Sequence, residues 1–165
     1  MDVREDKYLA GEYDGKLFIK IVGNATMKNS KTLDLLFDKV FKEAEKDIVI
    51  DLEESNYMDS TMLGLLAKTA IRLKKTWNKK MYVMNIPNSV GMSLKSTGVD
   101  KLMEFIEKEK VGEVVTEKLE TRDFGVKSEK SQHILDSHKV LMELNDENKV
   151  IFKNVVNLLE QELKK

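Results

Sequence analysis

A buried strand that leads into an amphipathic helix constrains the fold of this chain more than any other stretch. Residues 48–52, Ile-Val-Ile-Asp-Leu, form a short apolar run rich in β-branched side chains, which is typical of a strand. Residues 53–56 then indicate a polar turn. From Ser60 to about Trp77 apolar residues recur at the spacing of one helical face, and Ser60 is a preferred N-cap residue. This succession predicts a sheet covered by helices.

The rest of the first 110 residues alternates between strand and helix patterns. Asp14-Gly15 predicts a tight turn between two antiparallel strands. We predict an amphipathic helix that begins with Ser30 as its N-cap, and a shorter helix that ends before Gly98. The predicted strands are residues 8–13, 16–22, 48–52, 81–86 and 102–106, and the shorter helix is residues 89–96. The order predicts an α/β fold in which a small mixed sheet has parallel pairs made by crossovers.

The remaining residues predict a helical appendage. We divide the chain into a domain over residues 1–110, a short helix and linker over 111–130, and a C-terminal helical extension over 131–165. Asn145 begins a capping sequence with acidic residues in the first turn that follows, which favours two helices packed as a hairpin; one long helix is the alternative. Their apolar stripes must pack on the domain, on each other or on another chain, so a homodimer through these helices stays open.

Composition argues against several classes of partner. The 28 Lys and Arg residues nearly balance the 29 Asp and Glu residues, so no overall positive field attracts nucleic acid. Cysteine is absent, which removes disulfides, thiolate metal sites and cysteine nucleophiles. The N-terminus lacks a signal-peptide pattern, and no apolar run has the length of a membrane span. We therefore expect a cytoplasmic protein with neither a nucleic acid nor a membrane as its partner.

The sequence gives little support to catalysis or metal binding. His133 and His138 are five residues apart, about 140° around a helix, so they do not form an i, i+4 zinc pair. Ser60 has no Gly-x-Ser-x-Gly context, and no glycine-rich nucleotide motif is present. We expect a protein that is not an enzyme and holds no cofactor or metal, with the two histidines as ordinary surface or interface residues.

A hydroxyl at the start of a helix nevertheless has chemistry of its own. Free N–H groups and the positive end of the helix dipole favour an anion there, so the fold would tolerate a phosphate on Ser60. That phosphate would add about −1.5 to −2 charges beside Asp59 and would disfavour a partner surface that expects a neutral face. From the residues alone, Ser60 is either such a switch or only a helix cap.

One segment resembles the signature of a known family. Asp59-Ser60-Thr61 and the following Leu-Gly-Leu-Leu, after a strand that ends in Asp-Leu, are similar to the STAS domain of bacterial anti-sigma-factor antagonists. The resemblance covers about residues 7–110 and implies a STAS-like fold with Ser60 as the phosphoacceptor. The chain departs from the family pattern at Met62, where a glycine is common, and near Asn24, where members often carry acidic residues.

The resemblance also implies a function. It indicates an anti-sigma-factor antagonist that binds an anti-sigma factor, or a related serine kinase of the histidine-kinase-like ATPase class, while it is unphosphorylated. Phosphorylation of Ser60 would release the partner, and a metal-dependent serine phosphatase would reset the switch. Asp59, Thr61, Met62 and Asn24 are expected to contribute to the partner surface. The alternative is a STAS scaffold module in a larger signalling complex, without phosphorylation.

Overall fold

A mixed sheet forms the centre of the domain. The computed structural model describes residues 5–107 and 111–165. The strand order is β6-β5-β3-β2-β1-β7, with β4 paired to β2; β1 is antiparallel to β2 and β7, and all other pairs are parallel. The strands are β1 (Lys7–Tyr13), β2 (Lys16–Ala25), β3 (Asp47–Asp51), β4 (Ser55–Met58), β5 (Met81–Met84), β6 (Glu104–Phe105) and β7 (Glu117–Lys118).

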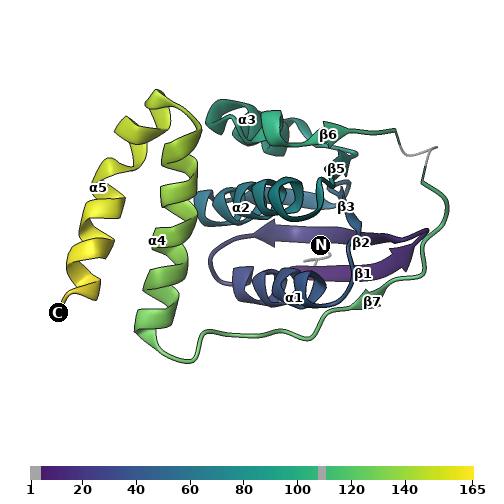
Figure 1. Ribbon diagram of the computed structural model, residues 1–165, viewed down its shortest axis with the longest axis horizontal. Helices are drawn as coiled ribbons and strands as arrows, with labels where there is room; N and C mark the ends of the chain where they lie inside the picture. The colour runs from purple at the N-terminus through teal and green to yellow at the C-terminus, as the bar shows by residue number, and fades with distance from the viewer. Residues whose placement is uncertain (1–4, 108–110) are drawn as a thin grey trace.

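The helices form a layer on the sheet and a separate hairpin (Figure 1). The first three, α1 (Ser30–Lys42), α2 (Ser60–Trp77) and α3 (Asn88–Thr97), follow β2, β4 and β5, and the short 3-10 helix η1 (Val99–Leu102) precedes β6. The hairpin consists of α4 (Lys127–Leu144) and α5 (Asp146–Leu163). The predicted α/β class, a small mixed sheet covered by helices with a C-terminal helical extension, is confirmed. Two helices, not one long helix, form this extension.

Local sequence signals explain the tight turns of the domain. Asp14 and Gly15 have φ values of 46° and 72°, the left-handed pair that a two-residue hairpin turn between right-twisted strands requires. Gly98 ends α3 with a φ of 81°, as its position predicted. Asn145 caps α5 because its side chain accepts a hydrogen bond from the backbone N–H of Asn148 at 2.8 Å.

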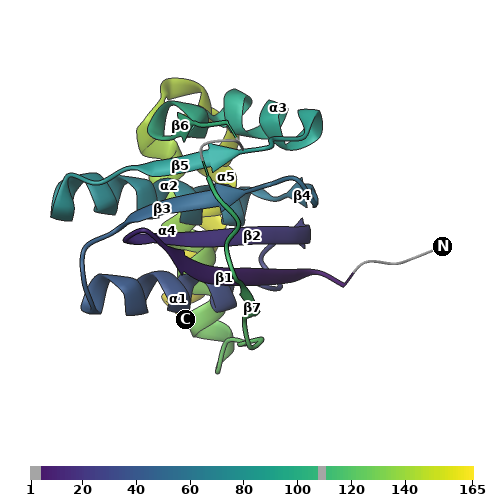
Figure 2. The same ribbon diagram turned by 90° about the vertical axis from the view of Figure 1, so that its right-hand side faces the viewer.

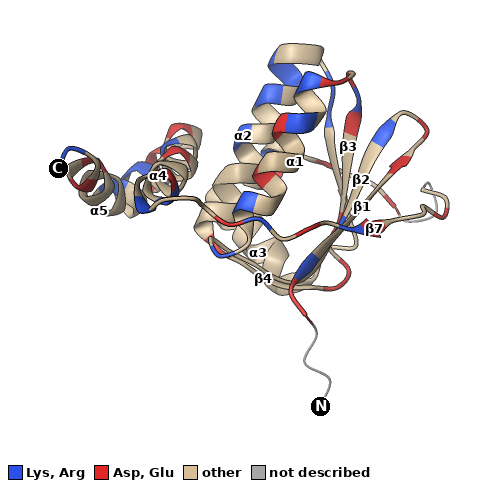
Figure 3. Cartoon of the chain, turned by 90° about the horizontal axis from the view of Figure 1, so that it is seen from below, with Lys and Arg blue, Asp and Glu red and all other residues tan. Residues whose placement is uncertain are grey.

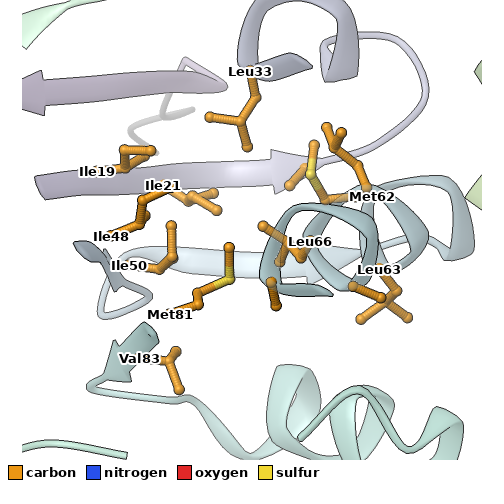
Figure 4. Close-up of a cluster of buried hydrophobic side chains, with 14 of the residues drawn as sticks. Ile19, Ile21, Leu33, Ile48, Ile50, Met62, Leu63, Leu66, Met81 and Val83 are labelled. Atoms are coloured by element: carbon orange, nitrogen blue, oxygen red, sulfur yellow. The ribbon is translucent and has the colours of Figure 1, made fainter. Parts of the chain in front are cut away.

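The main core lies between the sheet and the helices (Figure 4). Strand residues two apart point to the same face, so alternate side chains of β2, β3 and β5 meet the apolar stripes of α1 and α2. Met62, in the first turn of α2, is fully buried in this core and not at the surface. The side chains labelled in the close-up are Ile19, Ile21, Leu33, Ile48, Ile50, Met62, Leu63, Leu66, Met81 and Val83.

The opposite face of the sheet is crossed by the segment that leads to the hairpin (Figure 2). Phe18, Val49 and Met84 are buried there, with Val111 and Val114 packed against them. The short helix predicted within residues 111–130 is therefore wrong, because this apolar face and the free edge of β1 hold the segment extended as far as β7. The predicted domain boundary at residue 110 lies outside the described residues, and α4 begins at Lys127, before the predicted position 131.

A short strand replaces much of the polar turn predicted over residues 53–56. β2 does not end before Gly23 but continues through an irregular register at Gly23, where φ is 79°, to Ala25. This extension pairs with β4, whose Ser55 and Met58 are buried. Four residues with two buried side chains give too short a pattern to distinguish a strand from a turn in the sequence.

The hairpin packs across the ends of α1 and α2 at which these helices begin. Figure 3 shows it on the side of the two helices that faces away from the sheet. Gly64 of α2 lies directly against the backbone of Ser137 of α4, where a Cβ on Gly64 would collide with the Ser137 carbonyl oxygen. At the far end of α4, Leu141 is fully buried in the main core. The extension is therefore packed on the domain.

Two helical glycines give a matched test of this packing. Gly64→Ala should lower the free energy of unfolding by about 1–3 kcal/mol, because the added methyl group overpacks the contact with α4. Gly91→Ala, in the middle of α3, should be neutral or raise it by up to about 1 kcal/mol, because alanine favours helix and its Cβ meets only the end of the Ile86 side chain. Urea denaturation measures both. Equal effects of the two substitutions would contradict the close approach of α4.

Candidate functional site

The candidate site is built around the start of α2. Asp59 is the N-cap residue, and its carboxylate accepts hydrogen bonds from the backbone N–H of Met62 at 2.9 Å and of Met27 at 2.8 Å. Ser60 is the first residue of the helix and not its N-cap, which corrects the prediction. A carboxylate with two oxygens satisfies both amides at once and also suits the positive end of the helix dipole, so Asp59 takes the cap position.

The loop between β2 and α1 lies beside this helix start. Asn29 holds the loop, because its Oδ1 accepts from the Tyr8 hydroxyl at 2.6 Å and from the Thr26 N–H at 3.0 Å, and its Nδ2 donates to the Asn24 carbonyl at 2.8 Å. Burial, reinforced by the charge of Asp59, raises the pKa of Tyr8 far above its usual range, so this hydroxyl remains a donor. The loop therefore has a defined shape next to Ser60.

The residues expected on the partner surface differ in their exposure. Asn24 is exposed, and Asp59 and Ser60 are half-buried, so these three are available in part. Thr61 and Met62 are buried, and Met62 has no exposed surface at all. The expectation that Thr61 and Met62 form part of a contact surface is thus contradicted for this arrangement of the chain. Met62 belongs to the main core between the sheet and the helices.

The Ser60 hydroxyl contacts a histidine from the C-terminal hairpin. Ser60 Oγ lies 2.8 Å from His138 Nε2, and His138 Nδ1 lies 2.7 Å from the carbonyl oxygen of Ile134. A carbonyl can only accept, so Nδ1 carries a proton, and in a neutral ring Nε2 accepts the hydrogen bond from the Ser60 hydroxyl. The ring also packs edge-on against Phe152 of α5. α4 therefore covers the hydroxyl that the sequence singled out.

A second serine and histidine meet at the start of α1. Ser30 Oγ lies 2.9 Å from His133 Nε2, and His133 Nδ1 lies 3.6 Å from Asp34 Oδ2. Burial opposes the charge of Asp34, but the His133 ring and the nearby Lys68 outweigh this effect and lower its pKa. Serine, histidine and acid in this order resemble a hydrolytic triad, yet Ser30 has no exposed surface and offers a substrate no access. The group serves to anchor α4.

Ser30 was predicted to be an N-cap, and it is instead the first residue of α1 after Asn29. Its hydroxyl contacts the Met27 carbonyl and His133, which explains why it faces inward. The prediction missed both serine–histidine pairs, because they join positions 78 and 103 residues apart in the chain. The only signal in the sequence was the presence of two histidines in one helix of the appendage, which indicates a contact but not its partner.

Two further expectations concern metals and membranes. Among the described residues, no group of three or more His, Cys, Asp or Glu side chains is placed to hold a metal ion. Within the same parts of the chain, no helix combines the length and the apolar character that crossing a bilayer requires.

The fold and the site together define the class of this protein. It is a small α/β domain in which α2 starts with Asp59 as its cap and Ser60 as its first residue, joined to a helical hairpin that packs over this start. The chain belongs to the STAS domain family, because the model of the STAS domain matches residues 8–112. The hairpin of α4 and α5 lies outside the matched residues.

Two anti-sigma-B factor antagonists are similar to this chain in sequence. The chain is 28% identical over 85 residues to the anti-sigma-B factor antagonist of Staphylococcus aureus. The aligned residues cover 52% of this chain and 78% of that protein. The antagonist of Staphylococcus epidermidis is 27% identical with the same coverage.

Solved structures agree on the fold. The anti-sigma factor antagonist SpoIIAA in its unphosphorylated form matches with a TM-score of 0.51 and 17% identity, over 62% of this chain and 89% of that one. A candidate anti-sigma factor antagonist from Thermotoga maritima matches with a TM-score of 0.54 and 16% identity, over 62% and 92%. At these identities the likeness shows the fold alone.

The role of Asp59 as a cap can be tested by two substitutions. Asp59→Ala should lower the free energy of unfolding by about 1–2 kcal/mol, because the amides of Met62 and Met27 lose their acceptor. Asp59→Asn should recover only part of this loss, because its amide side chain keeps one acceptor oxygen where the carboxylate has two. Urea denaturation of the unaltered chain and the two variants gives the order of their free energies of unfolding. If Asp59→Ala is as stable as the unaltered chain, Asp59 does not hold the two segments together.

Proposed function

We propose that this protein is an anti-sigma-factor antagonist that works as a phosphorylation switch at Ser60. The observation that carries the proposal is the placement of Asp59-Ser60-Thr61 at the start of α2 in a STAS domain whose named relatives are anti-sigma-B factor antagonists. The unphosphorylated chain binds an anti-sigma factor or a related serine kinase. A serine phosphatase restores this form after phosphorylation.

The geometry gives the switch a physical basis. The Ser60 hydroxyl is neutral and able to donate a hydrogen bond, whereas a phosphate there carries about −1.5 to −2 charges. These charges would stand beside the Asp59 carboxylate. Asn24 is exposed and is expected to take part in the same partner surface, so a bound partner would meet the added charge. A partner surface that matches the neutral hydroxyl therefore meets a concentrated negative charge after phosphorylation, and the complex weakens.

The chain need not carry out chemistry in this cycle. The partner kinase supplies the nucleotide and the catalytic groups, and this protein supplies an acceptor hydroxyl on a rigid support. The support is the cap of Asp59, which fixes the first turn of α2 on the loop before α1. On this proposal the protein is a binding module and not an enzyme.

A scaffold role is the second candidate, and one contact favours it. The Ser60 hydroxyl already has a partner within the chain, His138, so its side chain has a structural use without any phosphate. In that case α4 and the domain form one permanent unit, and Ser60 only helps to hold them together. The two candidates differ in what a negative charge at position 60 does to an interaction.

Substitution of Ser60 distinguishes them. Ser60→Ala should abolish phosphorylation by a lysate of the source organism supplied with ATP, and should retain binding of the partner from that lysate. Ser60→Asp should weaken that binding by about tenfold or more, because a fixed negative charge replaces the hydroxyl. Mass spectrometry maps the phosphate, and pull-down followed by quantitative proteomics compares the bound proteins.

Ser96 provides the control, since it is an exposed serine of α3. Ser96→Ala should leave both phosphorylation and binding as they are. Phosphate on another residue, or equal binding by the alanine and aspartate forms of Ser60, would refute the switch. The second result would favour the scaffold role.

A further inference from the structure

The hairpin covers the surface that the proposed function assigns to a partner. α4 lies across the start of α2, its His138 accepts the Ser60 hydrogen bond, and Ser137 lies against Gly64 one turn further along. Resting on the proposed function of Ser60, we propose that the α4–α5 hairpin is an intramolecular competitor of the partner. Ser60 is then available only in molecules in which the hairpin has left this surface.

Steric exclusion is the first reason. A partner that reads the Ser60 hydroxyl has to approach within hydrogen-bond distance of it, and the His138 ring already occupies that position at 2.8 Å. The backbone of Ser137 leaves no room even for a methyl group on Gly64. A kinase or an anti-sigma factor therefore cannot share this face with α4, and the two binding events exclude each other.

The character of the contact makes its release feasible. Four of the six buried residues of α4 are polar, namely Ser131, His133, Ser137 and His138, and only Leu135 and Leu141 are apolar. At the turn of the hairpin, Asn145 and Asn148 donate to the Thr97 carbonyl at 3.2 and 2.8 Å. Interfaces held by hydrogen bonds of this kind resemble transient interfaces more than obligate ones, and their polar groups find water when they separate.

The connection to the domain permits the movement. Val111 and Val114 pack on the sheet, β7 pairs with β1, and the Arg122 N–H donates to Thr32 Oγ1 at 2.9 Å. Only residues 123–126 lie between the last of these anchors and α4, and they form neither helix nor strand, so the hairpin would move about this short segment. The hairpin can leave without unfolding the domain core, since among its residues only Leu141 is a fully buried member of that core. While it is tethered, its effective concentration at the site is on the order of millimolar, so a partner has to overcome a strong local competitor.

The absence of cysteine allows a test that needs neither kinase nor partner. Ser60→Cys places a single thiol at the site, and its rate of reaction with the aromatic disulfide reagent DTNB reports access to that position. Ser96→Cys, at an exposed serine, gives the rate of an open site. We expect the thiol at position 60 to react more slowly than the thiol at position 96 by roughly tenfold or more. Its rate is limited by the fraction of molecules in which the hairpin has left the start of α2.

Release of the hairpin should raise the rate at which the thiol at position 60 reacts with DTNB. Ser137→Arg, added to Ser60→Cys, puts a long charged side chain into the contact with Gly64 and should raise the rate roughly tenfold, towards that of the exposed site. Ser128→Arg makes the same change at an exposed position of α4 and should leave the rate unchanged. His133→Ala removes the contacts of α4 with Ser30 and Asp34 by a change within the hairpin, and should likewise raise the rate at which the thiol at position 60 reacts.

Two results would overturn the proposal. One is a thiol at position 60 that reacts as fast as the thiol at position 96 while the hairpin is unaltered. The other is a slow rate that neither Ser137→Arg nor His133→Ala increases, in variants whose circular dichroism shows the fold retained. Neither result depends on phosphorylation, so a failure of the Ser60 switch in the lysate experiment leaves this measurement interpretable.

Discussion

The Asp59 carboxylate connects the parts of the structure on which the candidate site depends. It accepts from the first turn of α2 and from the loop before α1, while the Asp59 N–H donates to Ala25 at the end of β2. One side chain thus sets the position of α2 relative to the neighbouring strand and loop. Because the carboxylate is bound on both sides, the residue that follows it, Ser60, begins the helix in a fixed orientation towards solvent and α4.

Much of the domain could be predicted because its signals are local. The alternating residues of β2 and β3, the apolar stripes of α1 and α2, and the turns at Asp14-Gly15 and Gly98 each act over a few residues. The Ser60 segment could also be found, since its motif is contiguous. The assignment of the cap was wrong by one residue because aspartate and serine are both strong N-caps and stand next to each other here.

The contacts that cover the site could not be predicted, for a physical reason. His138 meets Ser60, and His133 meets Ser30, only because β7 and the extended segment before α4 bring the hairpin to the start of the two helices. Nothing in the local pattern around Ser60 indicates which distant side chain completes its hydrogen bond. The burial of Met62 is a similar case, because a residue in the first turn of a helix faces either way depending on the entry angle of the chain.

An appendage that shares its surface with a partner changes what a switch at Ser60 does. If docking of α4 makes the phosphorylation equilibrium at Ser60 less favourable, linkage requires that a phosphate on Ser60 makes docking less favourable by the same factor. A phosphate on Ser60 would meet the His138 ring and the closely packed Ser137 backbone, so the phosphorylated chain favours an undocked hairpin. On the two proposals made above, the unphosphorylated chain divides between a closed form and an open form, and only the open form binds the partner. The stability of the α4 contact would then set the partner concentration at which the protein responds.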